Sequence, residues 1–253
     1  MSAVILTYHA IEEGRGPLFV DPDLFERHLD AIVASGASVL TVAQLGAAIR
    51  EDRLPERAVS ITFDDGFASV AQTAAPLLLE RGLSATVFCV GGWLGRTNDW
   101  PSQPKAIPRR PLATAAELAE AAAAGLEIGA HGMTHAPLSS GDELQLRREV
   151  VAGRVSLEDI TGAQVCSFAY PYGVSGSHLV RDLVAETYSA ACTVELRAVT
   201  GNDGTLALPR VDVHYIRPVR LLRRAVEGSL GPYLGARSVG ARARRRLLAL
   251  RMA

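Results

Sequence analysis

The sequence predicts an α/β fold in which parallel strands and helices alternate around a closed or nearly closed β/α barrel. Segments with the apolar character of buried strands alternate with segments of helical periodicity, a pattern typical of parallel strands joined by crossover helices. The number of these units favours a barrel over an open sheet. The chain has 253 residues, 48% of them hydrophobic, so it can bury a full core.

The first half of the chain contains the apolar segments AVILTY and RAVSITF. Both have the continuous apolar character of strands that are buried on both faces of a sheet. Between them, PDLFERHLDAIVAS has apolar residues at three- and four-residue spacing, which predicts an amphipathic helix. In this half the predicted strands are 3–8, 57–63 and 84–90, and the predicted helices are 22–35, 42–50 and 68–81.

The second half continues the alternation after one long irregular segment, residues 91–111. That segment is too long for an ordinary connection, so we expect it to form a functional loop over the strand ends. The three cysteines lie inside apolar runs without CxxC spacing, which indicates buried free thiols. The predicted strands here are 126–130, 164–169 and 188–194, and the predicted helices are 114–124 and 142–160.

Polar residues follow four of the predicted strands. In a parallel barrel the chemistry lies at the carboxyl ends of the strands, so residues at these positions are expected to meet at one rim. The strand-end residues are His9, Asp64, Asp65, His131, His135 and the segment 170–173, YPYG.

The motif HGMTH places His131 and His135 four residues apart, on one side of a helical turn. Two such imidazoles can bind one cation, but no glutamate follows His131, which disfavours a zinc protease. Without other ligands, two histidines at this spacing are more often a solvated or capping pair than a metal site. With a carboxylate from another strand end, it becomes a two-histidine, one-carboxylate set that leaves positions open for water and substrate.

The motif FDDG supplies that carboxylate. Adjacent carboxylates repel, so one of them needs a cation beside it, and the other can then act as a proton acceptor. A strand that simply ends in a turn is the alternative, because aspartate and glycine are common in turns. The nearby histidine pair favours the metal interpretation.

These motifs together resemble the polysaccharide deacetylases of carbohydrate esterase family four, which share the NodB homology domain. The resemblance rests on TFDDG, HGMTH and FAYPYG, and the opening LTYHAI with LPRVDV is similar to the branch with an N-terminal YH motif. That branch includes deacetylases of biofilm poly-N-acetylglucosamine. The resemblance implies a distorted (β/α)7–8 barrel, a divalent metal and hydrolysis of an N-acetyl group on an amino sugar.

The resemblance also implies roles for individual residues. Asp65, His131 and His135 correspond to the metal ligands, and Asp64 corresponds to the general base. The backbone N–H of Tyr172, held by Pro171, would stabilise the oxyanion. His9 is the candidate general acid.

A second group of residues is expected beside the substrate. His214 competes with His9 for the role of the acid and otherwise lies near the substrate with Pro171. Asp99 and Trp100 could replace the Asp-Trp motif of many family members. Alternatively, Asp99 could cap its own loop, and Trp100 could pack so as to hold that loop.

Two further departures from the family pattern carry consequences. Gly132 stands where a serine or threonine is usual, so we expect a less rigid metal loop. Ala169 stands where an arginine usually pairs with the catalytic aspartate, so another group must tune the pKa of Asp64.

Zinc is the default metal, but histidine and carboxylate ligands also accept cobalt, nickel or iron. Three alternative functions remain: hydrolysis of a small non-sugar amide on the same fold, non-catalytic glycan binding, and glycosyl transfer. Glycosyl transfer is the least supported, because the sequence has no recognisable glycine-rich phosphate loop. An acidic, aromatic cleft would favour a sugar, and a narrow pocket capped by arginine would favour a small anionic amide.

Charge divides the chain into an acidic body, residues 1–216, and a basic tail, residues 217–253. The tail has ten arginines and one acid, a net +9, which leaves −10 for the predicted catalytic domain. The acidic body argues against nucleic acid as a partner. The tail is expected to be helical and could bind an anionic membrane, although an amphipathic terminal helix more often packs on its own domain, here the acidic body. No signal peptide or apolar span is recognisable, so we expect a cytoplasmic protein, peripheral to the inner membrane face if the tail binds lipid.

Overall fold

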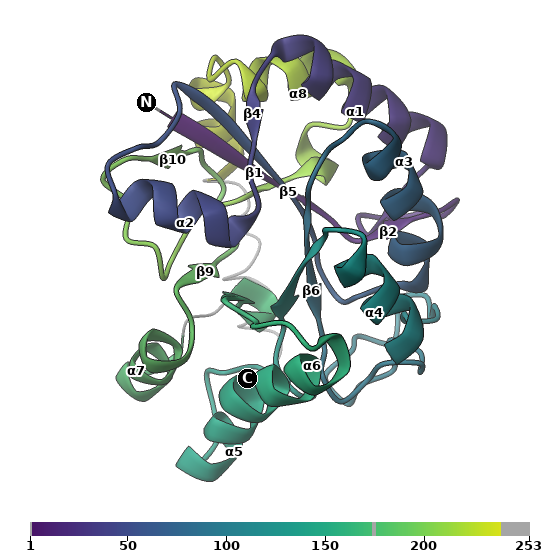
Figure 1. Ribbon diagram of the computed structural model, residues 1–253, viewed down its shortest axis with the longest axis vertical. Helices are drawn as coiled ribbons and strands as arrows, with labels where there is room; N and C mark the ends of the chain where they lie inside the picture. The colour runs from purple at the N-terminus through teal and green to yellow at the C-terminus, as the bar shows by residue number, and fades with distance from the viewer. Residues whose placement is uncertain (1, 174–175, 239–253) are drawn as a thin grey trace.

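A parallel sheet forms the centre of the computed structural model, which describes residues 2–173 and 176–238. Six strands pair side by side in the order of the chain (Figure 1). They are β1 (Ser2–Tyr8), β5 (Arg57–Phe63), β6 (Thr86–Cys89), β7 (Glu127–Ala130), β8 (Ser167–Ala169) and β9 (Ala190–Cys192). All six lie within the predicted strands or extend them by one residue.

The two ends of this sheet are joined by the segment 208–212. Leu208 forms a parallel bridge with Cys192 of β9, and β11 (Val211–Asp212) pairs in parallel with β1. The sheet therefore curls until β9 and β1 are connected, as expected for a distorted barrel. Two short strands pair with members of this sheet: β4 (Ser38–Val39) with β5, and β10 (Val199–Thr200) with β1. In a separate small sheet, β2 (Ala10–Ile11) pairs with β3 (Phe19–Val20).

Helices surround the sheet, and α1, α3 and α4 follow one another around the outside of β1, β5 and β6 (Figure 1). Side-chain caps begin several of them: Thr41 and Thr114 each form a capping box with the residue three positions later. The helices are α1 (Pro22–Ser35), α2 (Val42–Arg50), α3 (Ala75–Glu80), α4 (Ala115–Ala123), α5 (Glu143–Arg147), α6 (Gly153–Thr161), α7 (His178–Thr187) and α8 (Val219–Val226).

Two predicted helices contain a π-helical turn. Val70–Ala74 precedes α3, and Arg148–Ala152 separates α5 from α6. Such turns insert an extra residue into an α-helix and are frequent at functional sites. The second one carries Glu149, which is buried although it is charged.

The first part of the basic tail packs on the barrel. Helix α8 lies against α1, and its Leu222 is fully buried. His28 of α1, which the helical pattern would place in a polar stripe, is also fully buried. Its Nε2 lies 2.7 Å from the carbonyl oxygen of Arg217, and its Nδ1 lies 3.1 Å from the hydroxyl of Tyr8. Because a carbonyl only accepts, Nε2 donates and Nδ1 accepts from the tyrosine.

The arginine-rich segment 240–253 lies outside the described residues, so the predicted terminal helix is not seen. Within the described ranges, no helix is long and apolar enough to cross a bilayer. Cys89 and Cys192 are buried free thiols as expected, whereas Cys166 is partly exposed.

Candidate metal and active site

A cavity of about 300 Å³ opens where the strands end at their carboxyl termini. Its floor is polar and contains residues from β1, β5 and β7 and from the segment before β11. The strand-end residues that the sequence predicted therefore do meet at one rim. Those that line the cavity are His9, Asp64, Asp65, His131, His135, Tyr170 and Tyr172.

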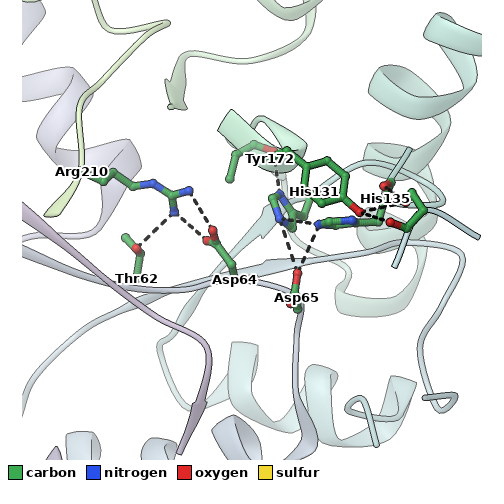
Figure 2. Close-up of polar contacts among 9 residues, drawn as sticks. Thr62, Asp64, Asp65, His131, His135, Tyr172 and Arg210 are labelled. Atoms are coloured by element: carbon green, nitrogen blue, oxygen red, sulfur yellow. Dashed lines mark hydrogen bonds and ion pairs between the residues drawn. The ribbon is translucent and has the colours of Figure 1, made fainter. Parts of the chain in front are cut away.

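Asp65, His131 and His135 form a compact buried cluster (Figure 2). The carboxylate Oδ1 of Asp65 lies 3.3 Å from Nε2 of His135 and 3.6 Å from Nε2 of His131. The two imidazole Nε2 atoms are 3.2 Å apart. Two neutral nitrogens and one carboxylate oxygen on one side of a shared point suit zinc and similar cations, with positions left for water and substrate.

A hydrogen bond to β8 orients the imidazole of His131 as a metal ligand. Its Nδ1 lies 2.8 Å from the carbonyl oxygen of Ala169, and because a carbonyl cannot donate, Nδ1 must carry the hydrogen. The lone pair is then on Nε2, which faces Asp65. Burial lowers the pKa of His131 to about 4, so the ring is neutral at pH 7 and can bind a cation.

His135 is held between two aromatic rings. Its imidazole stacks on Trp100 at a centroid distance of 4.4 Å and meets Tyr172 edge to face at 4.7 Å. Trp100 is only 2% exposed and does not line the cavity. Its burial and its stacking on His135 favour the alternative in which Trp100 packs within the protein rather than against a sugar.

Backbone strain is concentrated in this cluster. Among the described residues, four that are not glycine have a positive φ, and three of them lie here: Asp65 at 72°, His135 at 57° and Tyr172 at 59°. The left-handed region costs free energy for residues with a Cβ, and such strain tends to occur at functional sites. Surrounding contacts must hold these conformations.

Asp64 turns away from this cluster toward an arginine (Figure 2). Arg210 donates two hydrogen bonds to its carboxylate, at 2.6 and 2.8 Å, and both side chains are buried. Burial by itself raises the pKa of Asp64, but the charge and hydrogen bonds of Arg210 outweigh it and hold the pKa well below its usual value. Asp64 is thus ionised at neutral pH.

Arg210 is the functional residue that sequence reasoning missed. The family resemblance directed attention to position 169, where the arginine is absent, whereas Arg210 comes from the segment just before β11. The motif LPRVDV contains this arginine, but the local pattern indicates no role for it. Only the near closure of the barrel brings this residue beside the end of β5.

The remaining predicted residues differ in position. His9 lines the cavity, whereas His214 is exposed and does not. Tyr172 lines the cavity, where its backbone has a φ of 59°. Pro171 is buried beneath it.

Asp99 is also absent from the lining. It accepts a hydrogen bond from Nε1 of Trp93 at 3.2 Å and pairs with Arg109 at 3.1 Å. Both partners belong to the loop 91–111, so these contacts favour the alternative in which Asp99 holds its own loop.

The walls above the polar floor are largely apolar, which the sequence did not predict. Three different loops contribute them. The apolar wall consists of Pro17, Leu18, Pro104, Ile107, Val194 and Leu196.

Comparison with known proteins gives the following matches. The family model described as polysaccharide deacetylase matches residues 51–190. YxkH of Bacillus subtilis, whose name assigns it provisionally to the polysaccharide deacetylases, is 28% identical over 210 residues, which are 83% of this chain and 70% of the relative. A poly-β-1,6-N-acetyl-D-glucosamine N-deacetylase of Staphylococcus aureus is 23% identical over 76% of this chain and 67% of that protein.

Solved structures show the same fold. IcaB from Ammonifex degensii superposes with a TM-score of 0.72 at 24% identity, over 88% of this chain and 97% of the other. The Streptococcus pyogenes deacetylase PplD, solved with acetate, has a TM-score of 0.72 at 23% identity, over 83% of this chain and 92% of the other. The distorted barrel predicted from the sequence is confirmed by this likeness.

Proposed function

The chain belongs to the polysaccharide deacetylase family and is a carbohydrate N-deacetylase, and from this premise we propose that it hydrolyses the N-acetyl group of a hexosamine with the cluster of Asp65, His131 and His135 as its metal site. The observation that carries the proposal is the convergence of these three buried side chains beside Asp64. The donor set fits zinc, and cobalt, nickel or iron would be accepted by the same ligands.

A divalent cation held by these ligands supplies a Lewis acid and lowers the pKa of water in the site. Asp64 takes a proton from the attacking water, whose oxygen forms a bond to the acetyl carbon. Arg210 keeps the carboxylate of Asp64 ionised for this step. The backbone N–H of Tyr172 donates to the developing oxyanion. When the C–N bond breaks, a general acid protonates the nitrogen, and the products are acetate and the free amino sugar.

His9 is our proposed general acid. It lines the cavity with the two aspartates, whereas the competitor His214 lies outside the lining. A general acid must reach the leaving nitrogen within hydrogen-bond distance, so its place in the cavity favours His9.

For the substrate we propose a hexosamine joined to an apolar group, as in a glycolipid or a glycosylated natural product. The apolar wall supports such a substrate, because the hydroxyl groups of a fully polar glycan would find no hydrogen-bond partners against it. A small anionic amide is not supported. Within the described residues, the only arginine in the lining is Arg210, and its guanidinium is already bonded to Asp64.

The test is acetate release from N-acetylglucosamine oligomers, a methyl glycoside and an octyl glycoside of the same sugar. Burial of two methylenes of the octyl chain against the apolar wall contributes about 1.6 kcal/mol. We therefore expect the KM of the octyl glycoside to be roughly tenfold lower than that of the methyl glycoside. Equal KM values, or a preference for the oligomers, would reject the apolar aglycone.

The catalytic assignments are tested with variants in the same assay. Asp64→Asn and His9→Ala should each lower kcat by roughly 100-fold or more while zinc content stays at one per chain. His214→Ala is the matched control and should stay near wild type. Release of acetate that persists in a chelator, or loss of activity only in His214→Ala, contradicts the assignment.

We also propose peripheral association with an anionic membrane through the basic tail, supported by its net charge of +9. The test is sedimentation with anionic vesicles of the full chain and of a chain that ends at residue 238. A cut at Pro218 would remove α8 and its buried Leu222. Residues 239–253 carry five of the ten arginines of the tail, and equal sedimentation of the two chains rejects a role for this part of it.

A further inference from the structure

A buried carboxylate lies directly behind the HGMTH loop. Glu149, in the π-helical turn Arg148–Ala152, is 6% exposed. Its Oε2 accepts hydrogen bonds from the backbone N–H groups of Met133 and Thr134, at 3.0 and 2.9 Å. Its Oε1 accepts from the hydroxyl of Thr134 at 2.5 Å. All three donors therefore lie between the two histidines of the proposed metal site.

The shape of the loop depends on this carboxylate and on the glycine beside it. Gly132 has a φ of 82°, in the left-handed region, and a Cβ placed on it would lie only 2.8 Å from Oε2 of Glu149. The sequence suggested that Gly132 makes the loop less rigid because a hydroxyl is missing. Instead, the absent side chain makes room for a charged acceptor, which forms stronger hydrogen bonds than a hydroxyl would.

Backbone contacts also fix the loop. Gly91 and Gly92, which follow β6, donate N–H bonds to the carbonyl oxygens of Gly132 and Met133 at 3.0 and 2.9 Å. A Cβ on Gly153, at the start of α6, would lie 2.9 Å from the carbonyl carbon of Gly132. The loop thus packs directly against the backbone of the segment after β6 and of α6, because glycine at these positions leaves no Cβ in between.

We propose that Glu149 is a positioning residue that sets the distance between the imidazoles of His131 and His135 and so controls metal affinity. His131 is fixed by β7 and by the carbonyl of Ala169, whereas the backbone that joins it to His135 runs through residues 132–134. Glu149 holds the middle of that connection. The inference rests on the proposed metal site, but it assigns to Glu149 no contact with metal or substrate.

Glu158 offers a matched control on the same helical segment. Its carboxylate likewise accepts a backbone N–H, from Val165 at 2.9 Å, and pairs with Arg154 at 2.7 Å. These partners lie on α6 and on the connection to β8, away from the HGMTH loop. Loss of either glutamate removes a carboxylate that caps a backbone segment, but only Glu149 should affect the metal.

The experiment measures zinc dissociation constants of the full chain by competition with a chromophoric chelator. We expect Glu149→Ala to raise Kd about 10- to 100-fold, as for other residues that orient metal ligands. Glu149→Gln keeps the shape but replaces charged acceptors with weaker neutral ones, so we expect about a fivefold increase. Glu158→Ala should stay within twofold of wild type. The absorption spectrum of the cobalt-loaded protein should change in the Glu149 variants and not in Glu158→Ala.

A wild-type Kd and an unchanged cobalt spectrum in Glu149→Ala would overturn the inference, as would an equal loss in Glu158→Ala. If Glu149→Ala does not fold, Glu149→Gln decides: a Kd within twofold of wild type rejects the role. Acetate release by the wild type is scored separately. Zinc binding without acetate release contradicts the proposed function, while the Kd series still decides the role of Glu149.

Discussion

Two neighbouring aspartates have opposite environments at the end of β5. Asp64 faces a guanidinium, and Asp65 faces two imidazoles (Figure 2). Their separation solves the problem that two adjacent buried carboxylates would otherwise repel each other. The guanidinium of Arg210 keeps Asp64 ionised, and Asp65 remains available to bind a metal.

Replacement of Arg210 by methionine should change the pH dependence of the reaction. Without the guanidinium, burial is the dominant influence and raises the pKa of Asp64, so the base becomes protonated at a higher pH. We expect the acidic limb of the kcat/KM profile to move up by roughly 1 to 3 pH units.

The matched control is Arg197→Met, which breaks the more exposed pair with Asp203. Its pH profile should match that of wild type. An acidic limb that does not move in Arg210→Met would show that Asp64 does not limit the rate at low pH.

The same pair also contributes to stability in a defined pH range. The folded pKa of Asp64 lies below its unfolded value of about 3.9. The stabilisation is therefore fully present above that pH and is lost as the pH falls through the folded pKa. Since removal of one partner of a buried pair costs about 3 to 5 kcal/mol, urea unfolding of Arg210→Met at pH 7 should show a loss of this size.

At the scale of the elements, the loop 91–111 supports the proposed metal site and also contributes Ile107 to the wall of the cavity. Trp100 stacks on His135, and the hydroxyl of Ser102 donates to the backbone carbonyl of His135 at 2.8 Å. The hydroxyl of Tyr172 in turn donates to Ser102. Through Ser102 the loop thereby connects the segments that follow β7 and β8.

Trp100→Leu should weaken metal binding more than substrate binding. The lost ring leaves the imidazole of His135 free to tilt, so we expect the zinc Kd to rise about tenfold while the KM of the zinc-saturated enzyme stays near wild type. Trp93→Leu, which removes an indole that packs under Arg96 rather than on a ligand, is the control. A raised KM with unchanged zinc affinity in Trp100→Leu would restore the expectation of a sugar contact.

At the scale of the whole molecule, the site depends on the closure of the barrel. The floor of the cavity combines residues from β1, β5, β7 and the segment before β11, and the last of these reaches Asp64 only because Leu208 and β11 connect β9 to β1. A cation bound at this point contacts elements that are far apart in the sequence. Its binding should therefore stabilise the entire fold.

Zinc at 100 times its Kd should raise the free energy of unfolding by about 2.7 kcal/mol. For a chain of this length the melting temperature should then rise by roughly 5 to 10 °C. Thermal unfolding with zinc and with a chelator measures the difference. Asp65→Ala should abolish the shift, and a shift that persists in this variant would place the stabilising metal elsewhere.

The sequence by itself determined the barrel, the strand ends where the chemistry lies, and the identities of Asp64, Asp65, His131 and His135. These follow from local patterns, because apolar periodicity sets strands and helices and parallel strands bring their carboxyl ends to one rim. The tertiary structure alone decided that Arg210 pairs with Asp64, that Glu149 holds the loop of Gly132, and that Trp100 supports His135. These partners come from segments far away along the chain, and their contacts arise from the packing of the closed barrel, which no local periodicity encodes.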